Sequence, residues 1–402
     1  MYYLQDMRVD IITKEYPPEI YGGAGVHVAE LVKALRSGAD VRVRAFGADR
    51  DEQDVTAYRT PVELADANAA LQTLGTDLDM VPDVAGADVV HSHTWYANFA
   101  GHIAAQLHGI PHVLTAHSLE PLRPWKAEQL GGGYAVSSGI ERLAYENAAA
   151  IIAVSGGMRN DILRAYPQVD PARVHVIYNG IDVDAWHPVD DADVLAKHGI
   201  DSSRPSVVFV GRITRQKGLP YFLRAAEKLP PEVQLVLCAG APDTPEIMDE
   251  VRGLVSDLTA TRTGVVWIEE FLPRHELSAI LTAATTFVCP SVYEPLGIVN
   301  LEAMACGAAV VGTATGGIPE VVVDGVTGRL VPIEQVQDGT GTPVDPERFV
   351  SDLAATLTEV VSDPARAKAY GEAGRQRAAA DFSWAAIADT TRVLYEELTA
   401  RR

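Results

Sequence analysis

Residues 293–307 read YEPLGIVNLEAMACG and follow a short apolar run, TTFVCP, at 285–290. The run is typical of a buried parallel strand, and Pro295 and Gly297 predict a turn before a helix that starts at Ile298. The free amides of a first helical turn, together with the helix dipole, favour an anion such as phosphate. The sequence therefore predicts a strand, a turn and a helix whose N-terminus binds a phosphate.

Two carboxylates flank this helix start. Glu294 precedes the helix, and Glu302 lies about two turns along it. At a rise of ~1.5 Å per residue the two stand roughly 12 Å apart, which is farther than the paired carboxylates of glycosidases. We expect them to hold two parts of one long ligand rather than to act as an acid and a base.

The composition is that of a soluble globular protein. The chain has 402 residues, of which 47% are hydrophobic and 22% charged, and this length suits two or three domains. Its 33 basic and 54 acidic residues give a formal charge of −21, which argues against nucleic acid and anionic membranes as partners. Three cysteines without a paired spacing, and an N-terminus without a signal-peptide pattern, predict a cytoplasmic protein.

Short β-rich runs alternate with helical patterns through both halves of the chain. Strands are expected at 8–13, 41–46, 88–92, 112–116, 150–154 and 174–177, and then at 206–210, 234–238, 265–268, 285–289 and 309–312. This alternation predicts an α/β protein with two doubly wound parallel sheets. Ligands of such sheets lie beyond the carboxyl ends of the strands.

Glycines and cations follow the first strand of each half. KEYPPEIYGGAG places three glycines before a helix, which suits a phosphate or a sugar. In the second half, GRITRQKG carries Arg212, Arg215 and Lys217. Cations in this position can neutralise a diphosphate and stabilise it as it leaves.

Histidines gather at the end of the third strand, in HSHTWYANFAGHIA. His91, His93 and His102 have no carboxylate or cysteine at a matching spacing, and the alternate histidines are expected to point to opposite faces. The sequence therefore predicts no metal site. His93 and Trp95 are interpreted as residues of a ligand cleft or of the core.

The loop after the fourth strand, SLEPLRPWK at 118–126, combines an aromatic ring with two cations. Trp125 can stack on a sugar, and Arg123 and Lys126 can bind phosphate. These residues suit a sugar phosphate as acceptor; a solvated surface turn is the alternative.

The E-x7-E pattern behind a strand, with Gly211-Arg212 and Lys217 upstream, resembles the nucleotide-sugar site of retaining GT-B glycosyltransferases of family 4. SLEPLRPWK also resembles the short actinobacterial-type glycogen synthases, described as maltose-1-phosphate synthases too. The resemblance implies two facing Rossmann-like domains with the active site in the cleft. The N-terminal acceptor domain would span 1–182, completed by a C-terminal crossover helix at 383–402, and the donor domain would span 183–382.

The same resemblance implies roles for individual residues. The expected catalytic residues are His117 and Glu294 on the donor sugar and Arg212 and Lys217 on the diphosphate. The expected donor-binding residues are Gly22, Gly23, Gly297, Ile298, Val299, Glu302 on the ribose, Thr315 and Gly316. The expected acceptor-binding residues are Lys14, Tyr21, His93, Trp95, Arg123, Trp125 and Lys126.

The implied reaction moves glucose from ADP-glucose or UDP-glucose, with retention of configuration and without a cofactor. The acceptor would be glucose 1-phosphate, giving maltose 1-phosphate, or the non-reducing end of an α-1,4-glucan, and a homodimer is one option for the assembly. An alternative is a family 4 mannosyl- or glucosyltransferase with a lipid or other small acceptor, although the acidic stretch 49–83 argues against lipid docking. A non-catalytic sugar-nucleotide-binding protein and a dinucleotide-binding oxidoreductase are the alternatives from other classes, and the first strand lacks the G-x-G-x-x-G of the latter.

Overall fold

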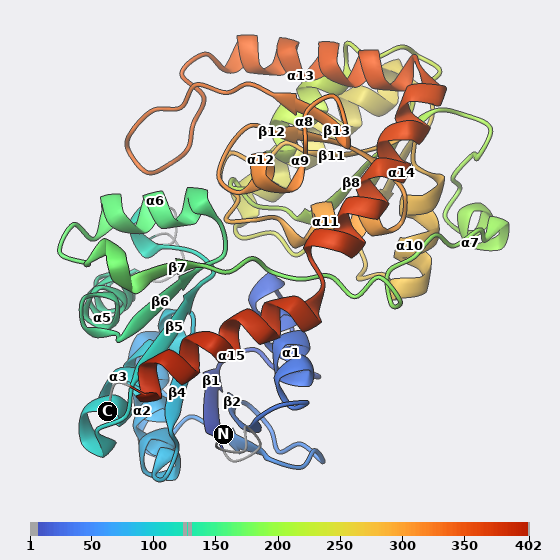
Figure 1. The fold of residues 1–402 in the computed structure, drawn as a ribbon. Helices are drawn as coiled ribbons and strands as arrows, with labels where there is room; N and C mark the ends of the chain where they lie inside the picture. Colours follow the sequence, from blue (N-terminus) through green and yellow to red (C-terminus); the bar gives the residue numbers. More distant parts are fainter. Residues whose placement is uncertain (1–6, 124–126, 128–130, 401–402) are drawn as a thin grey trace. The chain divides into compact units, whose positions relative to one another are not determined.

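The computed structural model describes residues 7–123, 127 and 131–400 (Figure 1). The chain divides into two compact units. Unit 1 comprises Met1–Gly180 together with Trp384–Arg402, and unit 2 comprises Ile181–Ser383. Each unit is built around its own parallel sheet with helices on it, so the predicted fold class of two Rossmann-like domains is confirmed.

The described part of unit 1 contains a seven-stranded parallel sheet in the order β3-β2-β1-β4-β5-β6-β7. Its strands are β1 (Arg8–Thr13), β2 (Asp40–Phe46), β3 (Val55–Tyr58), β4 (Val89–His93), β5 (His112–Ala116), β6 (Ala150–Ala153) and β7 (Val174–Val176). Its α-helices are α1 (Gly23–Leu35), α2 (Ala69–Met80), α3 (Trp95–His108), α5 (Gly133–Asn147), α6 (Gly156–Ala165) and α15 (Trp384–Ala400). Its 3-10 turns are η2 (Val62–Leu64), η3 (Val81–Val84), η4 (Glu120–Leu122) and η5 (Pro171–Arg173).

Unit 2 contains a six-stranded parallel sheet among its described residues, in the order β10-β9-β8-β11-β12-β13. Its strands are β8 (Ser206–Arg212), β9 (Gln234–Gly240), β10 (Val265–Ile268), β11 (Thr286–Cys289), β12 (Ala309–Thr313) and β13 (Gly328–Val331). Its helices are α7 (Ala192–Lys197), α8 (Leu219–Ala226), α9 (Pro245–Thr261), α10 (Arg274–Ala283), α11 (Ile298–Ala305), α12 (Ile318–Val321), α13 (Pro346–Val361) and α14 (Pro364–Asp381).

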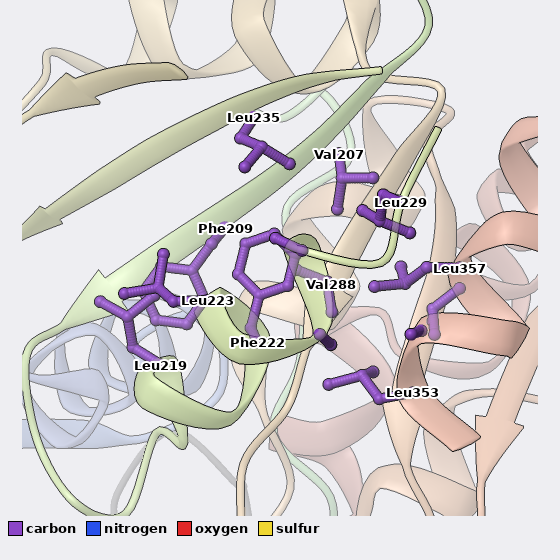
Figure 2. Packing of buried hydrophobic residues seen from close by; sticks show 14 of the residues in the cluster. Val207, Phe209, Leu219, Phe222, Leu223, Leu229, Leu235, Val288, Leu353 and Leu357 are labelled. Carbon is purple, nitrogen blue, oxygen red and sulfur yellow. The ribbon is translucent and has the colours of Figure 1, made fainter. Parts of the chain in front are cut away.

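The core of unit 2 fixes the strand ends that carry the candidate site. Phe209 on β8, Phe222 on α8 and Val288 on β11 meet Leu353 and Leu357 of α13 in one buried cluster (Figure 2). Fully burying a side chain of this size stabilises the fold by about 1.5–3 kcal/mol. The ends of β8 and β11 therefore stand on a packed and rigid base.

The C-terminal helix α15 belongs to unit 1, as predicted for the crossover helix. It packs on α1, and Trp384, Leu394 and Tyr395 enter the core of the first sheet. The Tyr395 hydroxyl lies 2.6 Å from His91 Nδ1 at the centre of that sheet. Helix α15 thus supports the middle of β4.

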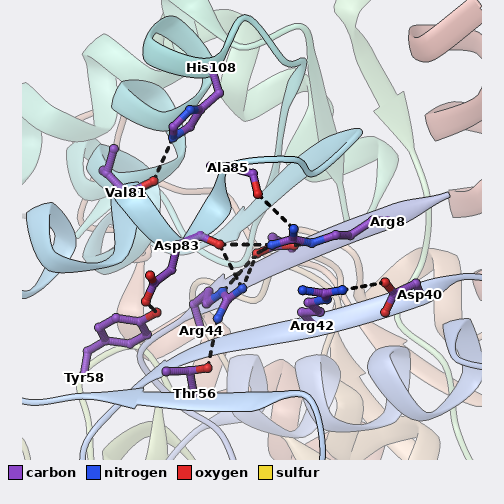
Figure 3. Close-up of polar contacts among 11 residues, drawn as sticks. Arg8, Asp40, Arg42, Arg44, Thr56, Tyr58, Val81, Asp83, Ala85 and His108 are labelled. Atoms are coloured by element: carbon purple, nitrogen blue, oxygen red, sulfur yellow. Dashed lines mark hydrogen bonds and ion pairs between the residues drawn. The ribbon is translucent and has the colours of Figure 1, made fainter.

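A buried charge network holds the first strands of unit 1 together. The Asp10 carboxylate accepts hydrogen bonds from Arg8 at 2.8 and 3.0 Å and from Arg44 at 2.9 Å. Arg44 reaches on to Thr56 of β3 and to the Asp83 carbonyl of η3, and the Asp83 carboxylate accepts from Tyr58 at 2.6 Å (Figure 3). Because Asp10 is fully buried, both guanidinium groups are needed to offset the cost of removing its charge from water.

No helix within the described ranges is both long and apolar enough to cross a membrane.

Candidate functional site

Lys217 and Glu294 come together at the carboxyl ends of β8 and β11. Lys217 Nζ donates to Glu294 Oε2 at 2.7 Å, and the Ser291 hydroxyl donates to the same oxygen at 3.0 Å. Glu294 is 5% exposed. Burial lowers the pKa of Lys217, but the carboxylate of Glu294 outweighs this effect, so the net pKa of the ammonium group is raised. Lys217 is therefore charged and held in one geometry against the carboxylate.

The turn before α11 packs against a second turn that follows β12, and each turn contains a glycine that no other residue can replace without strain. Gly297 has φ +90° and Gly316 has φ +56°, both in the left-handed region. A Cβ on Gly316 would overlap the carbonyl oxygen of Glu294, and the Gly317 amide donates to that oxygen at 2.9 Å. The two glycine turns thus interlock and fix the backbone that carries the Glu294 carboxylate.

Helix α11 starts at Ile298, as the sequence predicts. Its N-cap is Gly297, and no side chain caps it. Gly297, Ile298 and Val299 are partly exposed, whereas the residues on either side of them are buried. The amides of the first turn are therefore presented at the surface of unit 2 beside Lys217, which is the arrangement that binds a phosphate.

Glu302 lies on α11 and is 8% exposed. Burial raises its pKa to about 7 from the ordinary value of 4.5, although the charges of Arg274 and Lys217 oppose the shift. The carboxyl group is therefore divided between its neutral and ionised forms near pH 7. Hydroxyl groups of a ligand that donate to it would favour the ionised form.

Arg212 ends β8, and its guanidinium group forms an ion pair with Asp243 at 2.5 Å. Asp243 is nearly buried, while the Arg212 side chain is 40% exposed. Asp243 thus holds one edge of the planar guanidinium group of Arg212. The remaining N–H groups are available for a bidentate contact with an anion.

Thr315 and two residues that the sequence interpretation missed, Ser291 and Gln335, complete the surroundings. The Thr315 hydroxyl donates to Gln335 Oε1 at 2.9 Å, and Gln335 Nε2 donates to the Val292 carbonyl at 2.6 Å. Thr315 therefore ties down a loop, and its hydroxyl is already engaged. Ser291 and Gln335 are ordinary polar residues without a motif, so no sequence signal could have found them.

Asn300 was missed too, and it lines a pocket with Lys217, Glu294, Gly297 and Val299. It is fully buried, and its amide oxygen and nitrogen have no hydrogen-bond partner among the described residues. A buried amide without partners is costly unless a ligand or water satisfies it. Its only sequence signal was its place in the first turn of the predicted helix.

Unit 1 brings together a cluster of histidines at the ends of β4 and β5. His93 Nδ1 lies 3.0 Å from His117 Nε2, and the His91 and His93 rings are 4.3 Å apart. The expectation that these alternate histidines point to opposite faces is wrong, because side chains two residues apart on a strand share a face. His27 of α1 joins them, with its ring 4.7 Å from that of His117. Burial lowers the pKa of each of these four imidazoles, so they are neutral at pH 7.

The glycine loop before α1 is occupied by a side chain of its own unit. Glu15 Oε2 accepts from the Gly22 amide at 2.8 Å and from the Tyr21 amide at 3.1 Å. The Tyr21 side chain is 53% exposed. Lys14 Nζ lies 3.8 Å above the Tyr96 ring, and burial lowers its pKa. An internal carboxylate thus takes the place that an anionic ligand would use at Gly22.

Of the predicted acceptor residues, Arg123 lies on a loop that is tied to unit 1. Its Nη1 donates to the Ser118 hydroxyl at 3.0 Å, and the Tyr134 hydroxyl donates to the Glu120 carbonyl at 2.7 Å. Trp125 and Lys126 lie outside the described residues. Trp95 is 4% exposed, with its ring centroid 4.3 Å from that of its neighbour Tyr96, and His93 is buried, which fits the core alternative for both.

Comparisons with known proteins agree with this geometry. Residues 21–185 match the family model Glycosyltransferase Family 4, and residues 190–377 match Glycosyl transferases group 1. The chain is 58% identical to the α-maltose-1-phosphate synthase of Mycolicibacterium smegmatis, over 98% of this chain and 100% of the relative. It is 30% identical to a glycogen synthase of Mycobacterium tuberculosis, over 98% of this chain and 95% of the relative.

Among solved structures, the sucrose-phosphate synthase of Thermosynechococcus elongatus superposes with a TM-score of 0.78 at 25% identity, covering 98% of this chain and all of the other. That likeness extends over both sheets and agrees with the GT-B fold. This chain therefore belongs to the family 4 glycosyltransferases, nucleotide-sugar-dependent enzymes of GT-B fold, and within them to the group of the mycobacterial α-maltose-1-phosphate synthases.

Proposed function

We propose that this chain is a retaining glucosyltransferase that makes α-maltose 1-phosphate from ADP-glucose and glucose 1-phosphate. In this proposal UDP-glucose is a second donor, and the non-reducing end of an α-1,4-glucan is a second acceptor. The observation that carries the proposal is the Lys217–Glu294 pair beside the uncapped start of α11. Identity of 58% over the whole length to a maltose-1-phosphate synthase supports the choice of substrates.

The donor binds to unit 2 in this proposal. The first-turn amides at Ile298 and Val299 hold the distal phosphate, and Lys217 and Arg212 supply the positive charge. Glu294 accepts from hydroxyls of the glucose, and Glu302 accepts from the ribose. The burial of Glu302, whose pKa is raised to about 7, supports this role, because ribose hydroxyls that donate to the carboxylate would offset the cost of its burial.

The reaction breaks the bond between C1 of the donor glucose and the diphosphate oxygen, and it forms a bond from C1 to the acceptor hydroxyl oxygen on the same face. The proton of that hydroxyl passes to the departing phosphate oxygen. Negative charge grows on the diphosphate during this step, and Lys217, Arg212 and the α11 amides stabilise it. The chemistry requires neither a protein nucleophile nor a divalent metal.

The acceptor binds to unit 1 in this proposal. His117 contacts the transferred sugar, and Arg123 with Lys126 binds the phosphate of glucose 1-phosphate while Trp125 covers its ring. Because Glu15 already accepts from the Gly22 amide, we assign the donor phosphate to α11. Gly22 and Gly23 then allow a close approach of sugar to backbone.

The cytoplasmic location and the assembly are parts of the same proposal. Cys238, Cys289 and Cys306 are free thiols, which fits a reducing compartment. We propose a homodimer as the assembly, and sedimentation of the purified protein tests it, because the mass of a single chain would contradict it.

The acceptor assignment is tested with the double variant Arg123→Ala/Lys126→Ala. Loss of charge-assisted phosphate contacts, worth about 1.5–3 kcal/mol each, should raise the KM for glucose 1-phosphate at least roughly tenfold. Initial rates with glycogen as acceptor should change less than about twofold, because that acceptor carries no phosphate at the reacting end. Arg142→Ala, which removes a 65% exposed arginine from α5, is the matched control. Equal losses on both acceptors would contradict a phosphate site at this loop.

A further inference from the structure

Three histidines of unit 1 present ring nitrogens to one point. His27 comes from α1, His93 from the end of β4 and His117 from the residue after β5. One nitrogen from each of the three rings lies within 4.8 Å of the others. Chain segments far apart in the sequence thus bring three imidazole nitrogens together.

The hydrogen bonds decide which nitrogen of His27 carries the proton. Its Nδ1 lies 2.7 Å from Asn179 Oδ1, which can only accept, so Nδ1 is the protonated nitrogen. Nε2 therefore carries a lone pair, and this buried atom has no hydrogen-bond partner among the described residues. A histidine that donates one N–H to an amide oxygen and keeps a lone pair on the other nitrogen is the usual form of a metal ligand.

The contact between His93 and His117 has nearly the spacing of two ligands of one ion. Their Nδ1 and Nε2 atoms are 3.0 Å apart and share one proton. Nitrogens bound tetrahedrally to Zn²⁺ at ~2.0–2.1 Å lie about 3.4 Å from each other. The ring centroids are 5.3 Å apart, so the two nitrogens point almost directly at each other. An ion replaces the shared proton once each ring tilts by roughly 35° to aim its lone pair at one centre, and the proton moves to the other nitrogen of its own ring. His27 would close the site by moving up to about 1.5 Å.

We propose that His27, His93 and His117 form a binding site for one first-row transition-metal ion that prefers imidazole, such as Zn²⁺. The donor set excludes Mg²⁺ and Ca²⁺, which require oxygen ligands. Three protein ligands leave a fourth position for water. The sequence interpretation predicted no metal site because it considered only His91, His93 and His102 and missed α1.

A bound ion would act as an inhibitor. It fixes the His117 ring and occupies its Nε2, so that the ring no longer contacts the donor sugar. This consequence rests on the proposed function, in which transfer itself needs no metal. The binding site does not rest on it.

Binding is tested with the full-length, chelator-treated protein and Co²⁺ and Zn²⁺ as probes. Co²⁺ should give the intense visible absorption of four-coordinate cobalt at one ion per chain, and Zn²⁺ should displace it. Loss of one ligand in His27→Gln should weaken binding at least roughly tenfold, whereas His187→Gln, which removes an exposed histidine of unit 2, should leave it unchanged. Equal binding by the wild type and His27→Gln would overturn the proposal.

X-ray absorption of the Zn²⁺-loaded wild type gives a test that needs no variant. Three imidazole nitrogens at about 2.0 Å are expected, and a six-coordinate shell of oxygens would overturn the proposal. Zn²⁺ should also inhibit glucosyl transfer by the wild type over the concentration range in which it binds. Binding without inhibition would overturn the inhibitory role alone, and no transfer even without Zn²⁺ would contradict the proposed function instead.

Discussion

Replacing Glu302 with glutamine should stabilise the protein, and the gain should depend on pH. In the folded protein burial raises the pKa of this carboxyl to about 7, whereas its ordinary value is 4.5. At pH values between 4.5 and about 7, the carboxyl group is ionised in the unfolded chain and neutral in the folded chain. The folded state therefore loses stability as pH rises from 4.5 to 7. A pKa difference of this size corresponds to about 3 kcal/mol above pH 7.

Glutamine has nearly the same shape and no charge, so Glu302→Gln removes this penalty. We expect the variant to be more stable than the wild type by about 3 kcal/mol at pH 8 and by less than about 0.5 kcal/mol at pH 4.5. The measurement is urea unfolding, followed by circular dichroism, at four pH values from 4.5 to 8. Glu372→Gln, on the exposed side of α14, should stay within about 0.5 kcal/mol of the wild type throughout.

A stability difference that does not grow with pH would refute the reasoning, and a variant less stable than the wild type at pH 8 would show that Glu302 is ionised and paired in the folded state.

The same carboxyl makes binding of the donor depend on pH. If the ribose donates to ionised Glu302, binding of ADP near pH 7 releases a proton, and calorimetry in two buffers of different ionisation enthalpy should detect it. Glu302→Gln should abolish that release.

Other substitutions test the remaining parts of the account. Lys217→Met removes the cation from buried Glu294 and from the leaving diphosphate; initial rates should show a loss of kcat/KM of at least roughly 100-fold, and a rate near that of the wild type would exclude the proposed role. Gly316→Ala forces a side chain onto the Glu294 carbonyl at φ +56°; thermal unfolding should show a loss of about 2–3 kcal/mol, and an unchanged Tm would contradict the interlocked turns. Asp77→Asn should stabilise the protein at pH 8 and less so at pH 4, because burial in α2 raises the pKa of this carboxyl well above its usual value and neither of its oxygens has a hydrogen-bond partner among the described residues; urea unfolding at both pH values checks this, and an equal effect at both would contradict it.

Local chemistry made the start of α11 predictable. Pro295 and Gly297 break the chain after an apolar run, and the residues from Ile298 to Ala305 favour a helix. The short strands β3 and β13 were missed. VTAY at 55–58 is half exposed and GRLV at 328–331 begins with glycine, so both owe their structure to pairing with β2 and β12 rather than to their own sequence.

The candidate site was predictable only where a motif marked it. The E-x7-E pattern and the cations of GRITRQKG led to Glu294 and Lys217, which the structure brings within 2.7 Å. The histidine cluster required the three-dimensional fold, because His27 reaches it from a helix and is held by Asn179, 152 residues away. Glu15 was missed for the same reason, since nothing in KEYPPEIYGGAG indicates that its carboxylate folds back onto the Gly22 amide.

The most direct test of the central claim is the identity of the product formed from ADP-glucose. The purified protein is incubated with ADP-glucose and glucose 1-phosphate, and the products are analysed by mass spectrometry and proton NMR, with glycogen as the acceptor in a parallel reaction. The account predicts a phosphorylated disaccharide with a new α-1,4 linkage, formed together with ADP. Extension of glycogen without that disaccharide would contradict the claim that glucose 1-phosphate is the acceptor, and release of ADP with neither product would contradict glucosyl transfer to either acceptor.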